Sequence, residues 1–156
     1  MINKRFAAST LIVSASTLVL VAVNEGFSPT AYLDSVGKPT IGFGETKNVQ
    51  IGQKTDVTRS LRQLQDSLDI HAQGMIECIK VPVSQGEYNA YLSFTYNVGV
   101  GAFCSSTLNK KLNSGDYAGA CKELLKWTTA GGKVVPGLLK RRQEEFQECS
   151  QMSKVS

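Results

Sequence analysis

The sequence predicts a mostly helical α+β fold with one small sheet near its N-terminal end. Between residues 57 and 79, apolar side chains recur at three- and four-residue intervals, as on the buried face of an amphipathic helix. Residues 31–44 instead form two short stretches around a turn that carries Gly37 and Pro39, which is typical of a β-hairpin. The chain has 156 residues, of which 42% are hydrophobic, so we expect one core divided into two lobes around a cleft.

The first expected elements are a helix, a hairpin and a long helix. The first helix should end near Gly26, because glycine readily adopts the left-handed conformation that closes helices. The two strands are expected at residues 31–34 and 40–44. The long helix is expected at residues 57–79, and either Thr55 or Asp56 is suited to cap its start.

The remaining expected elements are all helices. Ser84 and Glu87 have the spacing of a capping box, so a helix should begin at residue 85 and run to residue 96. Three more helices are expected at residues 107–113, 116–127 and 136–149.

Three side chains near the N-terminal end are the groups that cutting a glycosidic bond requires. Glu25 and Asp34 lie nine positions apart, and Thr40 follows six positions later. The reaction needs a carboxylic acid that keeps its proton and can protonate the leaving oxygen. It also needs a second group that stays ionised near the developing positive charge. Two carboxyls in different surroundings can supply this pair.

The surroundings of the three side chains suggest their roles. Glu25 ends a long uncharged helical stretch, where the negative end of the helix dipole and apolar neighbours both favour the protonated form, so Glu25 is the expected acid. Asp34 precedes a turn with polar backbone and Lys38, which should keep it charged as a stabiliser or base. The hydroxyl of Thr40 can donate and accept, and we expect it to position a water molecule.

The run EGFSPTAYLDSVGKPTIGFGET resembles the N-terminal signature of the phage-type lysozymes. It contains the pattern EG-x7-D-x5-T-x-G-x-G, with Glu25, Asp34 and Thr40 at its three polar positions. The segments YNVGVGAF, STLNKKLNSGDY, W-TTAGGK and GLLKRR follow in the order found in that family. The resemblance covers residues 24–149 and implies a small β-hairpin lobe and a larger helical lobe on either side of a cleft.

The family resemblance also implies an activity. It indicates a muramidase, a glycoside hydrolase that cleaves the β-1,4 bond between N-acetylmuramic acid and N-acetylglucosamine in peptidoglycan, mostly by an inverting route. It places Asn97 at the cleft as a substrate contact, although Asn97 is equally suited to cap the end of its helix. Many relatives carry His at the position of Glu45, a difference that concerns a local polar contact. No metal or organic cofactor is implied.

Two alternative functions remain open at this point. A lytic transglycosylase needs an acid but no attacking water, and the presence of Asp34 and Thr40 argues against it. A membrane-tethered protein that binds the cell wall without hydrolysing it would keep the same fold.

Residues 1–24 form the one compositional break in the chain. Residues 6–24 carry no charge, while Lys4 and Arg5 precede them and Glu25 follows. A cleaved signal peptide would remove the helix that carries Glu25. A permanent anchor usually needs about 20 strongly apolar residues, and this run is shorter and diluted by Ser and Thr. A segment that inserts into the membrane and later leaves it fits better.

That behaviour resembles the signal-arrest-release (SAR) class of phage endolysins. We therefore expect residues 1–24 to be the SAR segment and residues 25–156 to be the lysozyme catalytic domain. Lys4 and Arg5 would stay cytoplasmic while the rest of the chain faces the periplasm, into which the enzyme is later released. Until then, the inserted segment would hold Glu25 against the lipid headgroups and keep the enzyme inactive.

The four cysteines predict two disulfides in an exported protein. Cys121 and Cys149 lie on two successive expected helices that could pack antiparallel, which favours pairing them and leaves Cys78 with Cys104, although four cysteines allow three pairings. A metal site is not expected, because Cys-x-x-Cys pairs and clustered histidines are lacking. His71 is expected on a helix surface rather than as a ligand or base.

The charge predicts an anionic partner. A net charge of +4 suits a polymer such as the bacterial cell wall. No arginine-rich groove motif favours nucleic acid, so we expect no nucleic-acid partner, and we expect a monomer. Lys140, Arg141 and Arg142 should be largely paired along their helix, because Glu144 and Glu145 lie four positions after Lys140 and Arg141. Arg141 or Arg142 could also face the cleft, although neither is expected to be catalytic.

Overall fold

The computed structural model describes residues 4–151 and confirms the mostly helical fold with small two-stranded sheets. Its elements are η1 (Ala8–Thr10), α1 (Ala15–Glu25), β1 (Ser28–Leu33), β2 (Pro39–Gly42), α2 (Val57–Cys78), α3 (Gln85–Val98), α4 (Val100–Ser105), α5 (Thr107–Asn113), α6 (Tyr117–Glu123), η2 (Leu124–Lys126), β3 (Thr129–Ala130), β4 (Lys133–Val134) and α7 (Pro136–Cys149).

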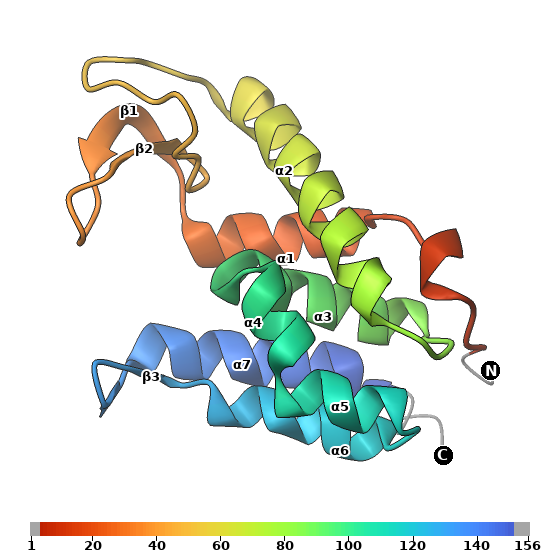
Figure 1. Ribbon diagram of the computed structural model, residues 1–156. Helices are drawn as coiled ribbons and strands as arrows, with labels where there is room; N and C mark the ends of the chain where they lie inside the picture. Colours follow the sequence, from red (N-terminus) through yellow and green to blue (C-terminus); the bar gives the residue numbers. More distant parts are fainter. Residues whose placement is uncertain (1–3, 152–156) are drawn as a thin grey trace.

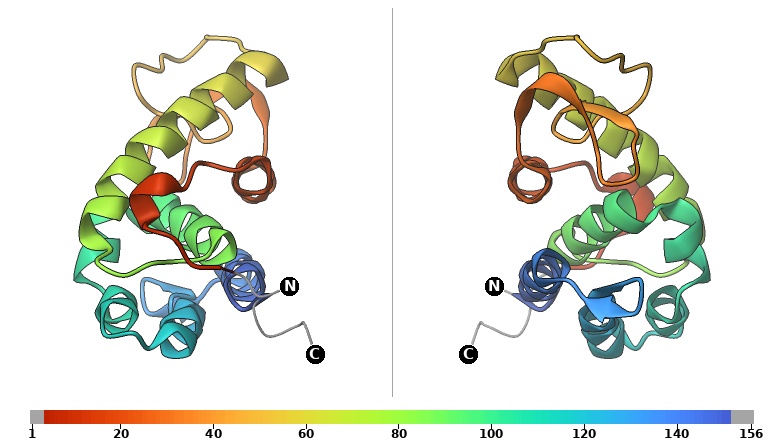
Figure 2. Two further views of the ribbon diagram at one scale, coloured as in Figure 1. Left: turned by 90° about the vertical axis from the view of Figure 1, so that its right-hand side faces the viewer. Right: turned by 90° about the vertical axis from the view of Figure 1, so that its left-hand side faces the viewer.

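The molecule has two lobes, which Figures 1 and 2 show from three sides. The hairpin lobe contains β1, β2 and the loop that leads into α2. The helical lobe contains α3 to α7, and α2 runs from one lobe to the other. In the hairpin, the antiparallel register pairs Tyr32 with Thr40 and Leu33 with Pro39. Asp34 therefore follows the last strand pair, at the start of the turn.

Helix α3 is the centre of the helical lobe. It packs against α1, α2, α4 and α7, and its residues 90–95 are all 0% exposed. The predicted capping box starts it, because the Ser84 side chain accepts from the Glu87 N–H and the Glu87 carboxylate accepts from the Ser84 N–H. Its central position makes α3 a rigid support for side chains that reach the space between the lobes.

Several predicted boundaries are confirmed. Helix α1 ends at Glu25 with Gly26 at φ 72°, and Asp56 caps α2 by accepting the N–H of Arg59. The single helix expected at residues 116–127 is wrong in its second half, because α6 ends at Glu123 and a 3-10 turn follows. Helix α4 and the short β3–β4 hairpin were not predicted. The two disulfides join Cys78 to Cys104 and Cys121 to Cys149.

The N-terminal segment packs into the folded molecule. Phe6 pairs with Val83 through two backbone hydrogen bonds of 2.9 and 2.8 Å, and Thr17, Val21 and Ala22 of α1 are buried. The boundary expected between residues 24 and 25 lies within α1. Across residues 4–151, no helix combines the length and apolar character needed to cross a membrane.

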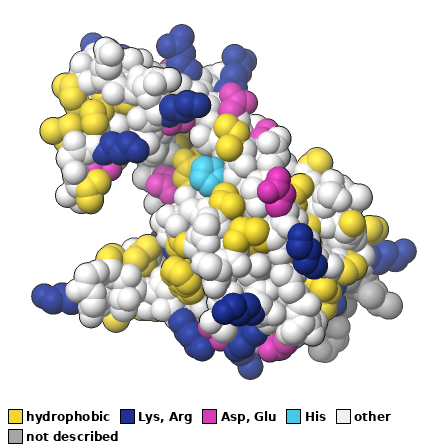
Figure 3. Space-filling view, viewed as in Figure 1, with side chains coloured by type: hydrophobic (Ala, Val, Ile, Leu, Met, Phe, Trp, Pro, Cys, Tyr) yellow, Lys and Arg dark blue, Asp and Glu magenta, His cyan; other side chains and the backbone are white. Residues whose placement is uncertain are grey.

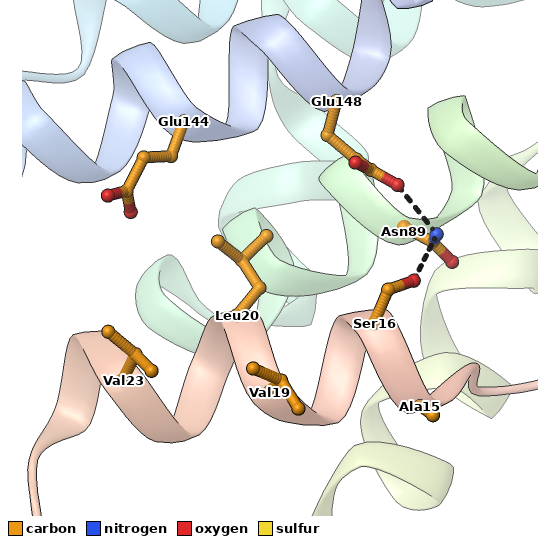
Figure 4. A pocket seen from close by; sticks show the side chains of 8 residues that line it. All are labelled: Ala15, Ser16, Val19, Leu20, Val23, Asn89, Glu144 and Glu148. Atoms are coloured by element: carbon orange, nitrogen blue, oxygen red, sulfur yellow. Dashed lines mark hydrogen bonds between the residues drawn. The ribbon is translucent and has the colours of Figure 1, made fainter.

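A groove of about 520 Å³ separates α1 from α7 (Figure 4). Its α1 wall is mostly apolar, whereas Glu144 and Glu148 stand on the α7 side. Asn89 of α3 closes one end, where its amide donates to Ser16 Oγ at 3.2 Å and to Glu148 Oε1 at 2.8 Å. Ser16, an exposed polar residue near the start of α1, thus has a specific partner in the folded molecule.

Candidate active site

Glu25 lies where α1 ends and the chain turns into the hairpin lobe. Gly26 follows in the left-handed region, and its N–H closes the helix on the Ala22 carbonyl oxygen. The Glu25 carboxylate is partly exposed and accepts a hydrogen bond from Arg141 Nη1 at 2.7 Å. Arg141 belongs to α7, 116 positions further along the chain. A C-terminal helix therefore fixes the side chain expected to be the acid.

A cavity of about 280 Å³ opens beside Glu25. In Figure 3 the surface is hollowed between the two lobes, and the single histidine of the chain, coloured cyan, is visible beside this hollow. The lining side chains are polar and come from α1, the segment after β2, α2 and α3: Glu25, Gly44, Glu45, Thr46, Ser67, His71, Tyr96 and Asn97. Such a polar hollow suits a hydrated sugar better than an apolar ligand.

Asp34 and Thr40 lie on the hairpin and do not line this cavity. Asp34 Oδ1 accepts the backbone N–H groups of Val36 and Lys38 at 3.0 and 2.8 Å, so polar backbone surrounds the carboxylate as expected. Thr40 is 4% exposed, and its hydroxyl donates to the Lys38 carbonyl oxygen at 3.0 Å. Both side chains are thus held by the turn that separates β1 from β2.

The wall opposite Glu25 is a small polar cluster. The Ser67 hydroxyl donates to Glu45 Oε2 at 3.3 Å, and His71 Nδ1 donates to the Ser67 carbonyl oxygen at 2.7 Å. Glu45 therefore has a local polar contact of its own. His71 lies on α2 as expected, yet its side chain is partly buried and packs against Tyr96, with the two ring centroids 5.1 Å apart and the rings tilted by 51°. It also lines the cavity, which sequence reasoning missed.

Tyr96 remains neutral at the pH of growth. Burial raises the pKa of its hydroxyl, and the negative charges of Glu25 and Glu45 raise it further, while Arg141 opposes this effect. A neutral phenol can donate a hydrogen bond within the cavity.

Asn97 lines the cavity and does not cap its helix. Helix α3 continues to Val98, and Gly99 at φ 93° is the cap, so the capping interpretation of Asn97 is wrong. The Asn97 side-chain oxygen accepts a hydrogen bond from Arg142 Nη2. Within residues 4–151, this contact uses the side-chain oxygen and no hydrogen bond engages the amide nitrogen, which can therefore face a ligand.

The basic cluster on α7 is more than a set of surface ion pairs. The expected contact from Lys140 to Glu144 forms at 3.9 Å, and that from Arg141 to Glu145 forms at 3.2 Å. However, Arg141 is only 4% exposed and also holds Glu25. The helix-end argument for Glu25 did not include this contact.

Comparison with known proteins agrees with this arrangement. Residues 22–145 match the family model described as phage lysozyme. The chain is 40% identical to the endolysin of Acyrthosiphon pisum secondary endosymbiont phage 1, over 85% of this chain and 94% of that protein. It is 39% identical to the SAR-endolysin of Enterobacteria phage PA-2, over 80% of this chain and 76% of the other.

A solved structure shows the same fold. The endolysin from Escherichia coli O157:H7 phage FAHEc1 matches with a TM-score of 0.83 and 32% identity, over 90% of this chain and 94% of that one. The family match covers Glu25, the hairpin, the cavity and the Arg141–Arg142 pair of α7. The chain therefore belongs to the phage lysozyme family.

Proposed function

We infer that this protein is an endolysin, a glycoside hydrolase that lyses bacteria by cutting peptidoglycan as a muramidase. The observation that carries this inference is the carboxyl group of Glu25, held by Arg141 at a polar cavity between the lobes, in a chain of the phage lysozyme family. The bond cut is the β-1,4 linkage between N-acetylmuramic acid and N-acetylglucosamine.

We propose three catalytic roles. Glu25 protonates the leaving oxygen, Asp34 stabilises the developing positive charge or acts as the base, and Thr40 helps to place the attacking water. The hydrogen bonds that Asp34 accepts from the N–H groups of Val36 and Lys38 hold its carboxyl group in place, which supports its role. Asn97 contacts the substrate with its side-chain amide. Attack by water in a single displacement inverts the configuration at the cleaved carbon.

The test of the acid is the Glu25→Gln variant. Glutamine keeps the shape but cannot donate the proton, so the rate of turbidity loss of stripped Gram-negative cells should fall on the order of a hundredfold or more. Glu77→Gln, on the exposed surface of α2, is the matched control and should keep full activity. Unchanged lysis by Glu25→Gln would instead indicate a wall-binding protein that does not hydrolyse.

Product analysis separates the remaining alternatives. Mass spectrometry should detect hydrated reducing ends, whereas anhydro products would indicate a lytic transglycosylase. Nuclear magnetic resonance of the first product should show the α anomer, and the β anomer would contradict the inverting route.

We also propose that residues 1–24 act as a releasable membrane segment, with the N-terminus in the cytoplasm of the host, before the enzyme enters the periplasm. The likeness to a SAR-endolysin supports this. The polar residues that weaken membrane insertion also have partners after release. Ser14 Oγ donates to Asn89 Oδ1 at 3.0 Å and lies 3.1 Å from the hydroxyl of the fully buried Thr17. Each such contact stabilises the released form relative to the inserted one.

Release can be tested without disturbing the packed face of the segment. Ser9, Thr10 and Ala15 are exposed, so leucine at these three positions strengthens insertion and leaves the core unchanged. This variant should stay in the membrane fraction and delay lysis, whereas asparagine at the same positions should speed release. A leucine variant released as fast as the natural protein would refute the proposal.

We propose that the released enzyme is a monomer. Light scattering at micromolar concentration should give the mass of one chain, 16.9 kDa, and twice this mass would contradict the proposal.

A further inference from the structure

Glu145 is a fully buried carboxylate at the centre of a network that reaches the active site in two directions. Its side chain is 0% exposed. Oε1 accepts from the Ser93 hydroxyl at 2.8 Å and from Arg141 Nε at 3.2 Å, and Oε2 accepts from Arg142 Nη1. A buried carboxylate is costly unless it is paired, so its two guanidinium partners account for its presence.

The first branch leads to the proposed acid. Arg141 is held on one side by Glu145 and on another by the Ser93 carbonyl oxygen, which accepts from Nη2 at 3.0 Å. Only Nη1 then points to Glu25, at 2.7 Å. Because the guanidinium is planar and rigid, fixing two of its nitrogens fixes the third. Glu145 thereby sets the position from which Arg141 contacts Glu25.

The second branch leads to the proposed substrate contact. Arg142 Nη1 binds Glu145, Nη2 donates to Asn97 Oδ1, and Nε donates to the Trp127 carbonyl oxygen at 3.1 Å. Burial lowers the pKa of the Arg142 guanidinium, whereas the charge of Glu145 and its hydrogen bond raise it. Glu145 therefore helps to keep Arg142 charged and in contact with Asn97.

The charges around Glu25 depend on Glu145 as well. Arg141 and Arg142 bring two positive charges to this side of the site, and Glu145 offsets one of them. Without Glu145, one more uncompensated positive charge would lie beside the proposed acid, and a positive charge beside a carboxyl group makes it lose its proton more readily.

We propose that Glu145 is a positioning residue of the reaction: it orients Arg141 toward Glu25 and Arg142 toward Asn97, and its negative charge offsets part of the positive charge that they bring to the site. This inference rests on the proposed function, because it acts through the acid. The contacts of Glu145 are with Ser93, Arg141 and Arg142 and not with the cavity itself.

The test is the pH profile of kcat on purified peptidoglycan for Glu145→Gln. Glutamine keeps the shape and removes one negative charge, so the pH above which kcat falls should move down by about one unit. Four charged or titratable side chains face Glu25, namely Arg141 from α7, Glu45 from the segment after β2, His71 from α2 and Tyr96 from α3. All four stay unchanged in the variant.

A rescue variant covers the case in which Glu145→Gln does not fold. The double change Glu145→Gln with Arg142→Gln removes one buried charge of each sign, which buried ion pairs tolerate better than the loss of one partner. Its profile should return toward that of the natural enzyme. The kcat of the double variant should fall at a lower pH than that of Arg142→Gln alone, because these two proteins differ only in the charge at position 145.

Glu123→Gln is the matched control for a structural effect. Glu123 is also buried, at 4% exposure, and also pairs with two cations, Lys111 and Lys126, but it lies on α6. Glu123→Gln should keep the natural pH profile. The inference is overturned if folded Glu145→Gln keeps the natural profile, if Glu123→Gln shifts it equally, or if the double variant and Arg142→Gln have the same profile.

The failure of this inference can be distinguished from failure of the proposed function. An inactive Glu25→Gln together with an unshifted Glu145→Gln profile removes only the role of Glu145. A fully active Glu25→Gln removes the proposed acid and, with it, the basis for Glu145.

Discussion

Arg5 is expected to lock the N-terminal segment onto the released enzyme. Its guanidinium makes a bidentate ion pair with Glu87, with hydrogen bonds of 2.7, 3.1 and 3.2 Å, and lies 3.6 Å from the ring centroid of Tyr117. Glu87 also forms the capping box of α3, so this one carboxylate joins the segment to the central helix. In the proposed inserted state of residues 1–24, Arg5 would lie on the cytoplasmic side of the membrane and Glu87 would lack this partner.

The structure gives the size of the effect of Arg5→Gln. The Glu87 side chain is 2% exposed and that of Arg5 is 28% exposed. Removing one partner of a fully buried pair costs about 3–5 kcal/mol, and the exposure of Arg5 lowers the cost toward about 2 kcal/mol. Loss of the stacking on Tyr117 adds about 0.5–1 kcal/mol. We expect the free energy of unfolding to fall by about 3 kcal/mol and the melting temperature to fall by about 6–12 °C.

Thermal unfolding of the purified enzyme measures the loss of stability caused by Arg5→Gln, and Lys4→Gln is the control. Lys4 is exposed, and the ion pairs within residues 4–151 do not include it. Both variants remove one positive charge beside the proposed membrane segment, so any difference between them comes from the contacts of Arg5. In cells, only Arg5→Gln should shift the balance toward the inserted form, by about a hundredfold for 3 kcal/mol, and delay lysis.

A double-mutant cycle with Glu87→Gln isolates the ion pair. The two changes should be strongly non-additive, with a coupling of about 2 kcal/mol, because either one breaks the same contact. The reasoning is refuted if Arg5→Gln unfolds at the same temperature as Lys4→Gln, or if its effect and that of Glu87→Gln simply add.

Three further outcomes are expected. Gly44→Ala should lower kcat more than it lowers stability, because the added Cβ would lie 3.0 Å from Glu25 Oε2. The control is Gly115→Ala, at the same φ of 84° but with open space around the added Cβ, which should lower stability alone. Replacing both cysteines of the α6–α7 disulfide with alanine should cost about 3–4 kcal/mol in chemical unfolding for a 28-residue separation, yet keep activity at low temperature. The hydrogen bond from Lys111, followed by that from Lys126, lowers the pKa of Glu123 below its ordinary 4.5. Glu123→Gln should therefore be less stable than the natural protein at pH 7. The difference in the free energy of unfolding between the two proteins should shrink as the pH falls below about 4.5.

Local signals explain why much of the fold could be predicted. The capping box of Ser84 and Glu87 and the glycine after Glu25 act within one helical turn, and each element lies where these residues predict it. The boundaries of α5 and α7 agree for the same reason. Helix α4 was missed because its six residues, with a glycine among them, are too short to show a helical period.

The sequence by itself determined the residue types of the proposed chemistry, because Glu25, Asp34 and Thr40 fall within one short segment with a recognisable spacing. Only the tertiary structure decided how Glu25 is held. Arg141 contacts it from 116 positions away, whereas the sequence pattern favours the pair of Arg141 with Glu145 and leaves open whether Arg141 or Arg142 faces the cleft. The same holds for His71, whose place on a helix was expected but whose position at the cavity depends on where α2 lies. Spacing fixes contacts within a helix or hairpin, whereas contacts between distant elements depend on how those elements pack.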